Sequence, residues 1–232
     1  MLEVTGDTTP QHAAGQQLPV LNNLIQSPRS PPAWPNTCAL TIAGGVKCWG
    51  DNFNGELGDG TYTNRSTPVD VSGLTTGVTA ITAGGGNTCA LTTAGAVKCW
   101  GYNSNGQLGD GTTADRLTPV DVFDLKSGVT SISAGTFRST CAVTAEGAAK
   151  CWGYNGFGEL GDGTTTDRLT PVAVSGLEVG VADISAAGIH TCALTTAGAV
   201  KCWGYNSRGE LGDGTTTQRL APVAVIGLTG TA

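Results

Sequence analysis

The chain has 232 residues, of which 36 are glycine and 10 are proline, and only 13% are charged. Its net charge of -6 at pH 7 argues against a binder of nucleic-acid backbones, because that class needs a clustered basic surface. No apolar run of about 18 residues is present, so we expect no membrane-spanning helix. The amino terminus has neither the basic nor the apolar region of a signal peptide.

Residues 1–36 are expected to form an irregular amino-terminal segment. One piece of it, LPVLNNL at 18–24, resembles TPVDVSGL at 67–74 and indicates a degenerate repeat remnant. The stretch 27–36 is a poor central strand, since proline cannot donate a hydrogen bond to a β-ladder. Its prolines are Pro28, Pro31, Pro32 and Pro35.

A repeat dominates the rest of the chain. Its shared text reads C-A-L-T-x-x-G-x-V-K-C-W-G-x-N-x-x-G-x-L-G-D-G-T with small variations, and it is followed by an arginine and by P-V. Successive copies are 51, 52 and 51 residues apart, counted between Trp49, Trp100, Trp152 and Trp203. The predicted repeats are 37–74, 75–125, 126–177 and 178–228, with a short tail at 229–232.

Each period divides into four short strands. In the second repeat these are VTAITA (78–83), TCALT (88–92), AVKCWG (96–101) and PVDV (119–122). The first is rich in β-branched residues and ends at glycines, and none of the four shows the 3.6-residue spacing of a helix. Four strands in about 40–50 residues are typical of a β-propeller blade.

The cysteine spacing fits a hairpin in each repeat. If residues 93–95 form a three-residue loop with Gly95 in the left-handed conformation, Cys89 and Cys99 lie directly opposite each other. We therefore favour disulfides inside the repeats, which would place the protein outside a reducing cytosol. The pairs are Cys38–Cys48, Cys89–Cys99, Cys141–Cys151 and Cys192–Cys202. Reduced, buried thiols are the alternative, whereas a zinc site would need four converging ligands.

The run GAVKCWGYNSNGQLGDGT resembles the regulator of chromosome condensation repeat, in the cysteine-bearing form found in bacterial relatives described as tubulin-suppressor-like. The resemblance covers about residues 37–228 and implies an all-β fold, a β-propeller with four-stranded blades. The best-known members have seven blades, and this chain has text for about four. Kelch repeats, which share the period near 50, are the alternative family.

Three architectures follow from the blade number: a partial arc of a larger propeller, a four-bladed ring, or part of a multi-chain assembly. The proline-rich stretch predicts that the first blade lacks its first strand. An unpaired sheet edge of that kind would be a device for joining copies head to tail.

Residues present in every copy are interpreted as blade-building. Trp100 is expected to fill the space between blades, with the stem of Lys98 reaching water, and a stacking surface for a sugar or for light capture is the alternative. Asp110 is expected to contact Arg116, six residues later, in a pattern that every copy repeats. A calcium site is the alternative, but one aspartate per blade supplies too few oxygens.

The sequence shows no catalytic constellation, and we predict no enzyme, cofactor or metal site. His12 and His190 are the only histidines, and neither a nucleophile elbow nor a phosphate-binding loop is present. Function is expected at loop tips where the copies differ. The candidate partner-binding residues are Phe53, Asn54, Tyr62, Asn105, Phe137, Arg138, Phe157, His190 and Arg208. Asn64, in N-R-S, matches a glycosylation acceptor.

These observations favour a noncatalytic scaffold or binding module for an unknown protein partner, exported or displayed at a cell surface. A self-assembling structural subunit, a fibre or a ring built through the first blade, is the alternative. Guanine-nucleotide exchange, as in the eukaryotic namesake of the family, and inhibition of a secreted enzyme rank lower. Fold alone does not decide among them.

Overall fold

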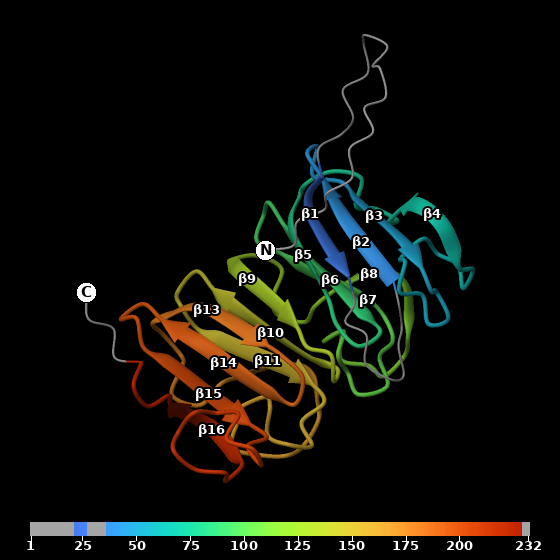
Figure 1. Cartoon of the computed structure of the whole chain (residues 1–232). Helices are drawn as coiled ribbons and strands as arrows, with labels where there is room; N and C mark the ends of the chain where they lie inside the picture. The colour runs from blue at the N-terminus through green and yellow to red at the C-terminus, as the bar shows by residue number, and fades with distance from the viewer. Residues whose placement is uncertain (1–20, 27–35, 229–232) are drawn as a thin grey trace, which may run out of the picture.

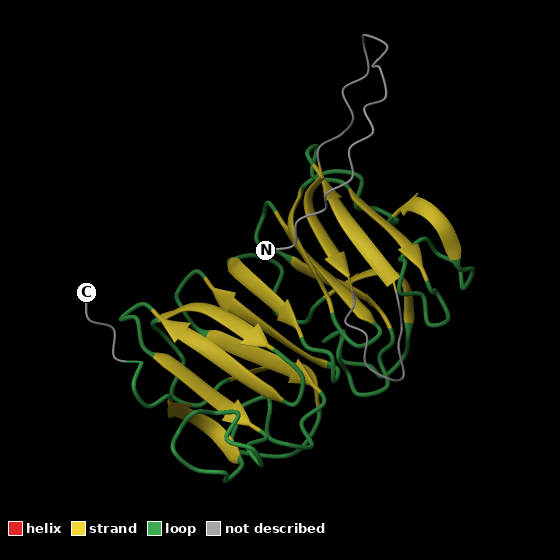
Figure 2. Ribbon diagram, viewed as in Figure 1, coloured by secondary structure: helices red, strands yellow, loops and turns green. Residues whose placement is uncertain are grey.

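The protein is seen in a computed structural model that describes residues 21–26 and 36–228, which form strands and loops but no helix (Figure 2). Within these ranges no helix suited to crossing a membrane is found. In this described part of the chain, sixteen strands form four antiparallel sheets of four strands each. The first sheet comprises β1 (Leu21–Gln26), β2 (Asn36–Thr41), β3 (Val46–Gly50) and β4 (Arg65–Asp70). The second comprises β5 (Val78–Ala83), β6 (Asn87–Thr92), β7 (Val97–Gly101) and β8 (Arg116–Asp121).

The remaining two sheets repeat this plan. The third comprises β9 (Val129–Ala134), β10 (Ser139–Thr144), β11 (Ala149–Gly153) and β12 (Arg168–Ala173). The fourth comprises β13 (Val181–Ala186), β14 (His190–Thr195), β15 (Val200–Gly204) and β16 (Arg219–Ala224). Every sheet pairs its strands in chain order, so each is a simple meander.

The four sheets follow one another along an open arc (Figure 1). Their amino-terminal strands adjoin, because β1 contacts β5, β5 contacts β9, and β9 contacts β13. This is the arrangement of propeller blades, and the predicted fold is confirmed. The first and fourth sheets lie at opposite ends of the arc, so the described residues do not close into a four-bladed ring (Figure 1).

The hairpin inside each repeat has the register that the cysteine spacing predicts. Cys89 on β6 pairs with Cys99 on β7, and the loop residue Gly95 has a φ of 74°. A disulfide joins the two, with Cα atoms 4.1 Å apart. The other three sheets have the same bond, Cys38–Cys48, Cys141–Cys151 and Cys192–Cys202.

The expectation that the first blade lacks its first strand is wrong. Strand β1 pairs with β2, with Leu24 opposite Ala39 and Ile25 opposite Cys38. The second sheet has the same register, with Ile81 opposite Ala90. The prolines do argue against a strand at 27–36, but the chain supplies one upstream of them, and residues 27–35 lie outside the described residues.

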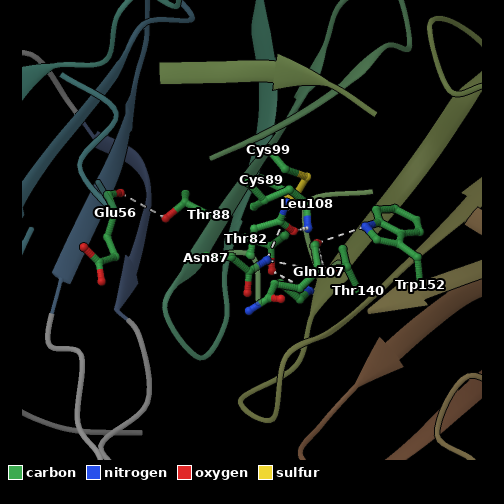
Figure 3. Close-up of a disulfide and its surroundings, with 12 residues drawn as sticks. Glu56, Thr82, Asn87, Thr88, Cys89, Cys99, Gln107, Leu108, Thr140 and Trp152 are labelled. Carbon is green, nitrogen blue, oxygen red and sulfur yellow. Dashed lines mark hydrogen bonds between the residues drawn. A yellow bond between two sulfur atoms is a disulfide. The ribbon is translucent and has the colours of Figure 1, made fainter. Parts of the chain in front are cut away.

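Neighbouring sheets are held together by a buried tryptophan. Trp100 on β7 is fully buried in one apolar cluster with Leu57 and Val71 of the first sheet. Its Nε1 donates a hydrogen bond of 2.8 Å to the backbone carbonyl of Glu56. Trp152 and Trp203 bind the carbonyls of Gln107 and Glu159 in the same way, and Figure 3 shows the Trp152 ring directed at Gln107. The predicted interblade role is therefore confirmed for these three residues.

Candidate functional site

A buried asparagine shapes the loop that follows the tryptophan strand. The Oδ1 of Asn103 accepts a hydrogen bond from Leu108 N at 2.9 Å, and its Nδ2 donates to the carbonyls of Thr112 and Ala114, both at 3.0 Å. Asn52, Asn155 and Asn206 make the corresponding bonds in the other repeats. Because the side chain satisfies backbone groups on both arms of the loop, the residues at the tip stand on a fixed base.

The aspartate of G-D-G closes the same loop. Asp110 forms an ion pair of 2.6 Å with Arg116 and accepts a hydrogen bond of 2.7 Å from the Thr112 hydroxyl. Burial acts to raise the pKa of Asp110, but the bonds from Thr112 and Arg116 outweigh it, and the pKa is lowered. The predicted contact between Asp and Arg is confirmed and lies within the blade. In the described part of the chain, no group of His, Cys, Asp and Glu residues could hold a metal ion.

Residues that differ between repeats meet where the second and third sheets adjoin. The guanidinium of Arg138 lies 4.8 Å from the centroid of the Tyr102 ring, and its Nη1 donates to Asn105 Oδ1 at 3.3 Å. Asn105 Nδ2 donates in turn to Asp167 Oδ2 at 2.8 Å. A cation stacked on a ring and tethered through an amide has a fixed direction.

Arg138 also has an unusual backbone conformation. Its φ is 68°, a left-handed value that costs a residue with a side chain about 1–2 kcal/mol. In the preceding spacer this place belongs to Gly86, because Gly86 accepts the N–H of Tyr102 as Arg138 accepts that of Tyr154. The spacer at 135–139 is one residue longer than the spacer at 84–87. Strain of this kind persists where the surroundings fix it, and it is concentrated at functional sites.

An aromatic group continues this surface onto the fourth sheet. The Phe157 ring meets Tyr205 edge to face at 5.2 Å between centroids and Tyr154 at 6.4 Å. Tyr154 N donates to the Arg138 carbonyl at 3.0 Å, which joins the two parts. We use the name Arg138 cluster for the set Tyr102, Asn105, Arg138, Tyr154, Phe157, Asp167 and Tyr205.

A fully buried carboxyl group lies beneath Phe157. Glu159 Oε2 accepts a hydrogen bond of 2.8 Å from Phe157 N, while Oε1 has no hydrogen-bond partner among the described residues. Burial raises the pKa of Glu159 to about 7, since the charged form loses its hydration. Gln107 fills the same place in the second repeat, and its Oε1 accepts from Asn105 N at 2.9 Å.

Several predicted site residues lie outside the Arg138 cluster. Phe53 and Tyr62 are 65% and 61% exposed, but both come from the first sheet, which contributes nothing to the cluster. Phe137 is 48% exposed in the longer spacer, next to Arg138. Asn54 donates to the Glu56 carboxylate at 2.8 Å, and Arg208 N donates to the Glu210 carboxylate at 2.8 Å.

The last two candidate residues, His190 and Asn64, also lie outside the Arg138 cluster. His190 is half-buried at the start of β14. Asn64 is exposed, but its Nδ2 donates to Asp51 Oδ1 at 3.2 Å and its Oδ1 accepts from Asn52 N at 2.8 Å. Glycosylation at Asn64 stays a prediction, and it would require the bond to Asp51 to open.

The tyrosines of the cluster were missed by the sequence analysis. Tyr102, Tyr154 and Tyr205 stand at one variable position of the repeat, directly after the W-G of the tryptophan strand, and none of them was among the candidate residues. The available signal was Asp51, which stands at that position in the first repeat. A position that is aromatic in three copies and acidic in the fourth is not required for blade construction.

The comparisons with known proteins agree with this description. The family model "Regulator of chromosome condensation (RCC1) repeat" matches residues 43–91, 94–142 and 146–194. The ultraviolet-B receptor UVR8 of Arabidopsis thaliana is 33% identical over 81% of this chain and 43% of its own length. The probable E3 ubiquitin-protein ligase HERC4 of Homo sapiens is 34% identical over 83% of this chain and 18% of its own length.

The crystal structure of Prp20p from Saccharomyces cerevisiae has the same fold, with a TM-score of 0.72 and 19% identity. The match covers 91% of this chain and 52% of Prp20p. The chain thus spans less than half of the two curated relatives and about half of this structural neighbour. Since the family model matches more than half of the residues, the chain belongs to the regulator of chromosome condensation (RCC1) repeat family.

Proposed function

We propose that this chain is a noncatalytic protein-binding module and that its partner contacts the Arg138 cluster. The observation that carries this proposal is the strained, ring-stacked Arg138, held at the junction of two sheets by Asn105 and Asp167. Arginine and tyrosine are the residues that most often dominate binding energy at protein interfaces. Mounted on a rigid sheet, they lose little conformational freedom when a partner binds.

The relatives support a protein as the partner. Prp20p has been studied for its binding to Gsp1p and histones, and yeast RCC1 (Prp20) has been crystallised with Kap60 bound. The ring edges of Tyr154, Phe157 and Tyr205, beside an arginine and an aspartate, favour a partner surface with an apolar centre and polar rim. Guanine-nucleotide exchange or enzyme inhibition would be special cases of such binding.

We propose an exported or cell-surface location, supported by four disulfides with no free cysteine in the described chain. We also propose that the propeller domain consists of four repeats that begin at residues 37, 75, 126 and 178. Strand β1, from the segment 1–36, completes the sheet of the first repeat. Self-assembly is the second candidate function. Strand β1 occupies the edge of the first sheet that the sequence predicted to be unpaired. Self-assembly is now favoured instead by exposed faces of the first and fourth sheets.

The test of the binding proposal compares variants at opposite ends of the strands. Proteins that bind the immobilised chain are identified from the secreted fraction, and the affinity of each is measured. Arg138→Ala combined with Phe157→Ala is expected to weaken the binding of the true partner by about a thousandfold, because two such anchors contribute about 2 kcal/mol each. Phe123→Ala is the matched control, since Phe123 is 61% exposed in the β8–β9 loop and outside the cluster. If the double variant bound the partner normally while Phe123→Ala lost binding, the partner would not contact the Arg138 cluster and the proposal would be refuted.

A further inference from the structure

The three junctions between sheets are built from one set of contacts. At the first junction, Leu40, Val71 and Leu74 of one sheet pack with Val78, Ile81 and Trp100 of the next. A backbone hydrogen bond of 2.9 Å from Gly60 N to the Leu117 carbonyl lies nearby, and Gly111–Leu169 and Gly163–Leu220 repeat it at the other two junctions. At the first junction we call the side of the earlier sheet that carries Leu40, Val71 and Leu74 the receiving face. We call the side of the later sheet that carries Val78, Ile81 and Trp100 the inserting face, because its tryptophan enters the neighbouring sheet.

The fourth sheet shows its receiving face uncovered. Leu194 is 42% exposed, whereas Leu91, at the same register position in the second sheet, is 6% exposed. Leu228 is 54% exposed, whereas Leu125 is 2% exposed. A shallow hollow on this face is lined in part by Cys192, Ala193, Leu194 and Val200. Apolar area of this kind favours association.

The polar groups of that face are also unused. The carbonyl of Glu210 corresponds to those of Glu56, Gln107 and Glu159, yet no described residue donates a hydrogen bond to it. Gly212 corresponds to Gly109, where a Cβ would lie 2.7 Å from Trp152 Nε1. At Gly212 a Cβ would meet only Val225 of its own sheet. The space beside Gly212 that a tryptophan ring fills at the other junctions is therefore open, and the Glu210 carbonyl lies beside it as a hydrogen-bond acceptor.

The first sheet shows the opposite, inserting face. Trp49 is only half-buried, and within the described chain its Nε1 has no acceptor. On β1, Leu21 and Leu24 occupy the register positions of Val78 and Ile81. The two ends of the arc thus carry the two halves of one junction.

We propose that the receiving face of the fourth sheet binds the inserting face of the first sheet of a second copy of this chain. Trp49 of one copy enters the space at Gly212 of the other and donates to its Glu210 carbonyl, while Gly214 N donates to the Ser66 carbonyl. The contact is heterologous, so two copies that close make a ring of eight sheets and copies that do not close make a filament. Ser66 stands where Leu117, Leu169 and Leu220 lie, so this contact has less apolar area than the internal junctions.

The second copy is favoured over an unrelated partner because the two faces match the internal junctions at Trp49, at the Glu210 carbonyl and at the register positions of Leu21 and Leu24, with Ser66 as the exception. The chain itself contains three examples of such a junction. Further repeats of this type in a longer protein would fill the same faces. The 232-residue chain itself is therefore the form to measure. This inference rests on the second candidate function, self-assembly, and deepens it, and it is independent of the Arg138 cluster.

The experiment is native mass spectrometry and sedimentation of the full chain and of two variants. The wild type is expected to form a dimer or longer species. Trp49→Ala, at the inserting face, and Leu194→Glu, at the receiving face, are each expected to weaken association by about thirtyfold or more. Both side chains are partly exposed in the single chain, so far-UV circular dichroism should show that each variant keeps the fold. Phe123→Glu is the control for an exposed apolar residue away from both faces, and it should associate normally.

Mixing the two variants gives the decisive result. Trp49→Ala retains an intact receiving face and Leu194→Glu an intact inserting face, so an equimolar mixture should form a one-to-one dimer that neither variant forms alone. A monomeric wild type, or association of Trp49→Ala alone at wild-type strength, would overturn the proposal. The latter result would indicate a symmetric contact between like faces.

Discussion

Trp152 on the third sheet donates a hydrogen bond of 3.0 Å from Nε1 to the backbone carbonyl of Gln107 on the second sheet. The same ring covers Gly109, where a Cβ would lie 2.7 Å from Nε1. Glycine is required at this position for two separate reasons, because its φ of 68° is left-handed and because the ring occupies the space of a side chain. The two reasons can be separated by experiment.

Gly109→Ala is expected to destabilise the protein by about 3 kcal/mol, of which about 1 kcal/mol reflects the left-handed backbone and the rest the collision with the ring. Gly163→Ala is the matched control, since its φ is 81° and a Cβ there would meet no atom within 4 Å. It should cost only about 1 kcal/mol. Urea denaturation of both variants measures the difference, and equal losses would show that the indole does not fill the space at Gly109.

Each disulfide closes a short loop, with a sequence separation of 10 residues. Replacing both Cys89 and Cys99 by alanine should lower the free energy of unfolding by about 2–3 kcal/mol on a chain-entropy basis. Reduction of the wild type should lower it further, because all four loops open. Urea midpoints with and without reductant, with full reduction verified by mass, test this prediction. An unchanged midpoint in the fully reduced protein would contradict it.

Much of the fold could be predicted because four copies of one text repeat its constraints. The β-branched run at 78–83, the cysteine spacing and Gly95 together fix the strands and register of the second sheet. The inner strand of the first sheet could not be predicted in the same way. Leu21–Gln26 shares only apolar positions with its counterparts, and the prolines that follow drew attention to the wrong segment.

The candidate site was predicted only in part. Asn105, Arg138 and Phe157 differ between copies and were identified for that reason. Their mutual contacts depend on how neighbouring sheets adjoin, which pairs Asn105 with Asp167, 62 residues away. No local pattern encodes that contact, and the tyrosines of the Arg138 cluster lie outside the loop tips at which candidate residues were sought.

The buried asparagine that shapes the loop after the tryptophan strand, Asn103, leads to a prediction about stability. Asn103→Ala removes the partner of Leu108 N and of the Thr112 and Ala114 carbonyls, and it should destabilise the protein by about 2–3 kcal/mol. Ser104→Ala, at the exposed neighbouring residue, should change stability by less than about 0.5 kcal/mol. Thermal unfolding of the two variants provides the comparison. Similar losses for both would mean that the loop does not depend on the buried amide.

Glu159 and Glu56 occupy the same place in different repeats and differ in their neighbours. The side-chain amide of Asn54 donates to Glu56 at 2.8 Å, whereas Phe157 offers Glu159 only a backbone N–H. Burial raises the pKa of both carboxyl groups, and it raises the pKa of Glu159 to about 7. We attribute the larger effect at Glu159 to the missing amide donor, since a hydrogen bond to the charged form favours ionisation.

The raised pKa predicts a defined dependence of stability on pH. Because the pKa of Glu159 rises from the usual 4.5 to about 7 on folding, the folded protein binds more protons than the unfolded chain between these values. The contribution of Glu159 is therefore fully present below about pH 4.5 and is lost as the pH rises through 7. Glu159→Gln, which copies Gln107, should be more stable than the wild type at pH 8 and lose most of that advantage at pH 5, where Glu159 is protonated. Glu56→Gln is the matched control and should show a smaller change. Urea denaturation at both pH values measures the difference, and an advantage of Glu159→Gln that is equal at both would disprove the buried, protonated carboxyl group.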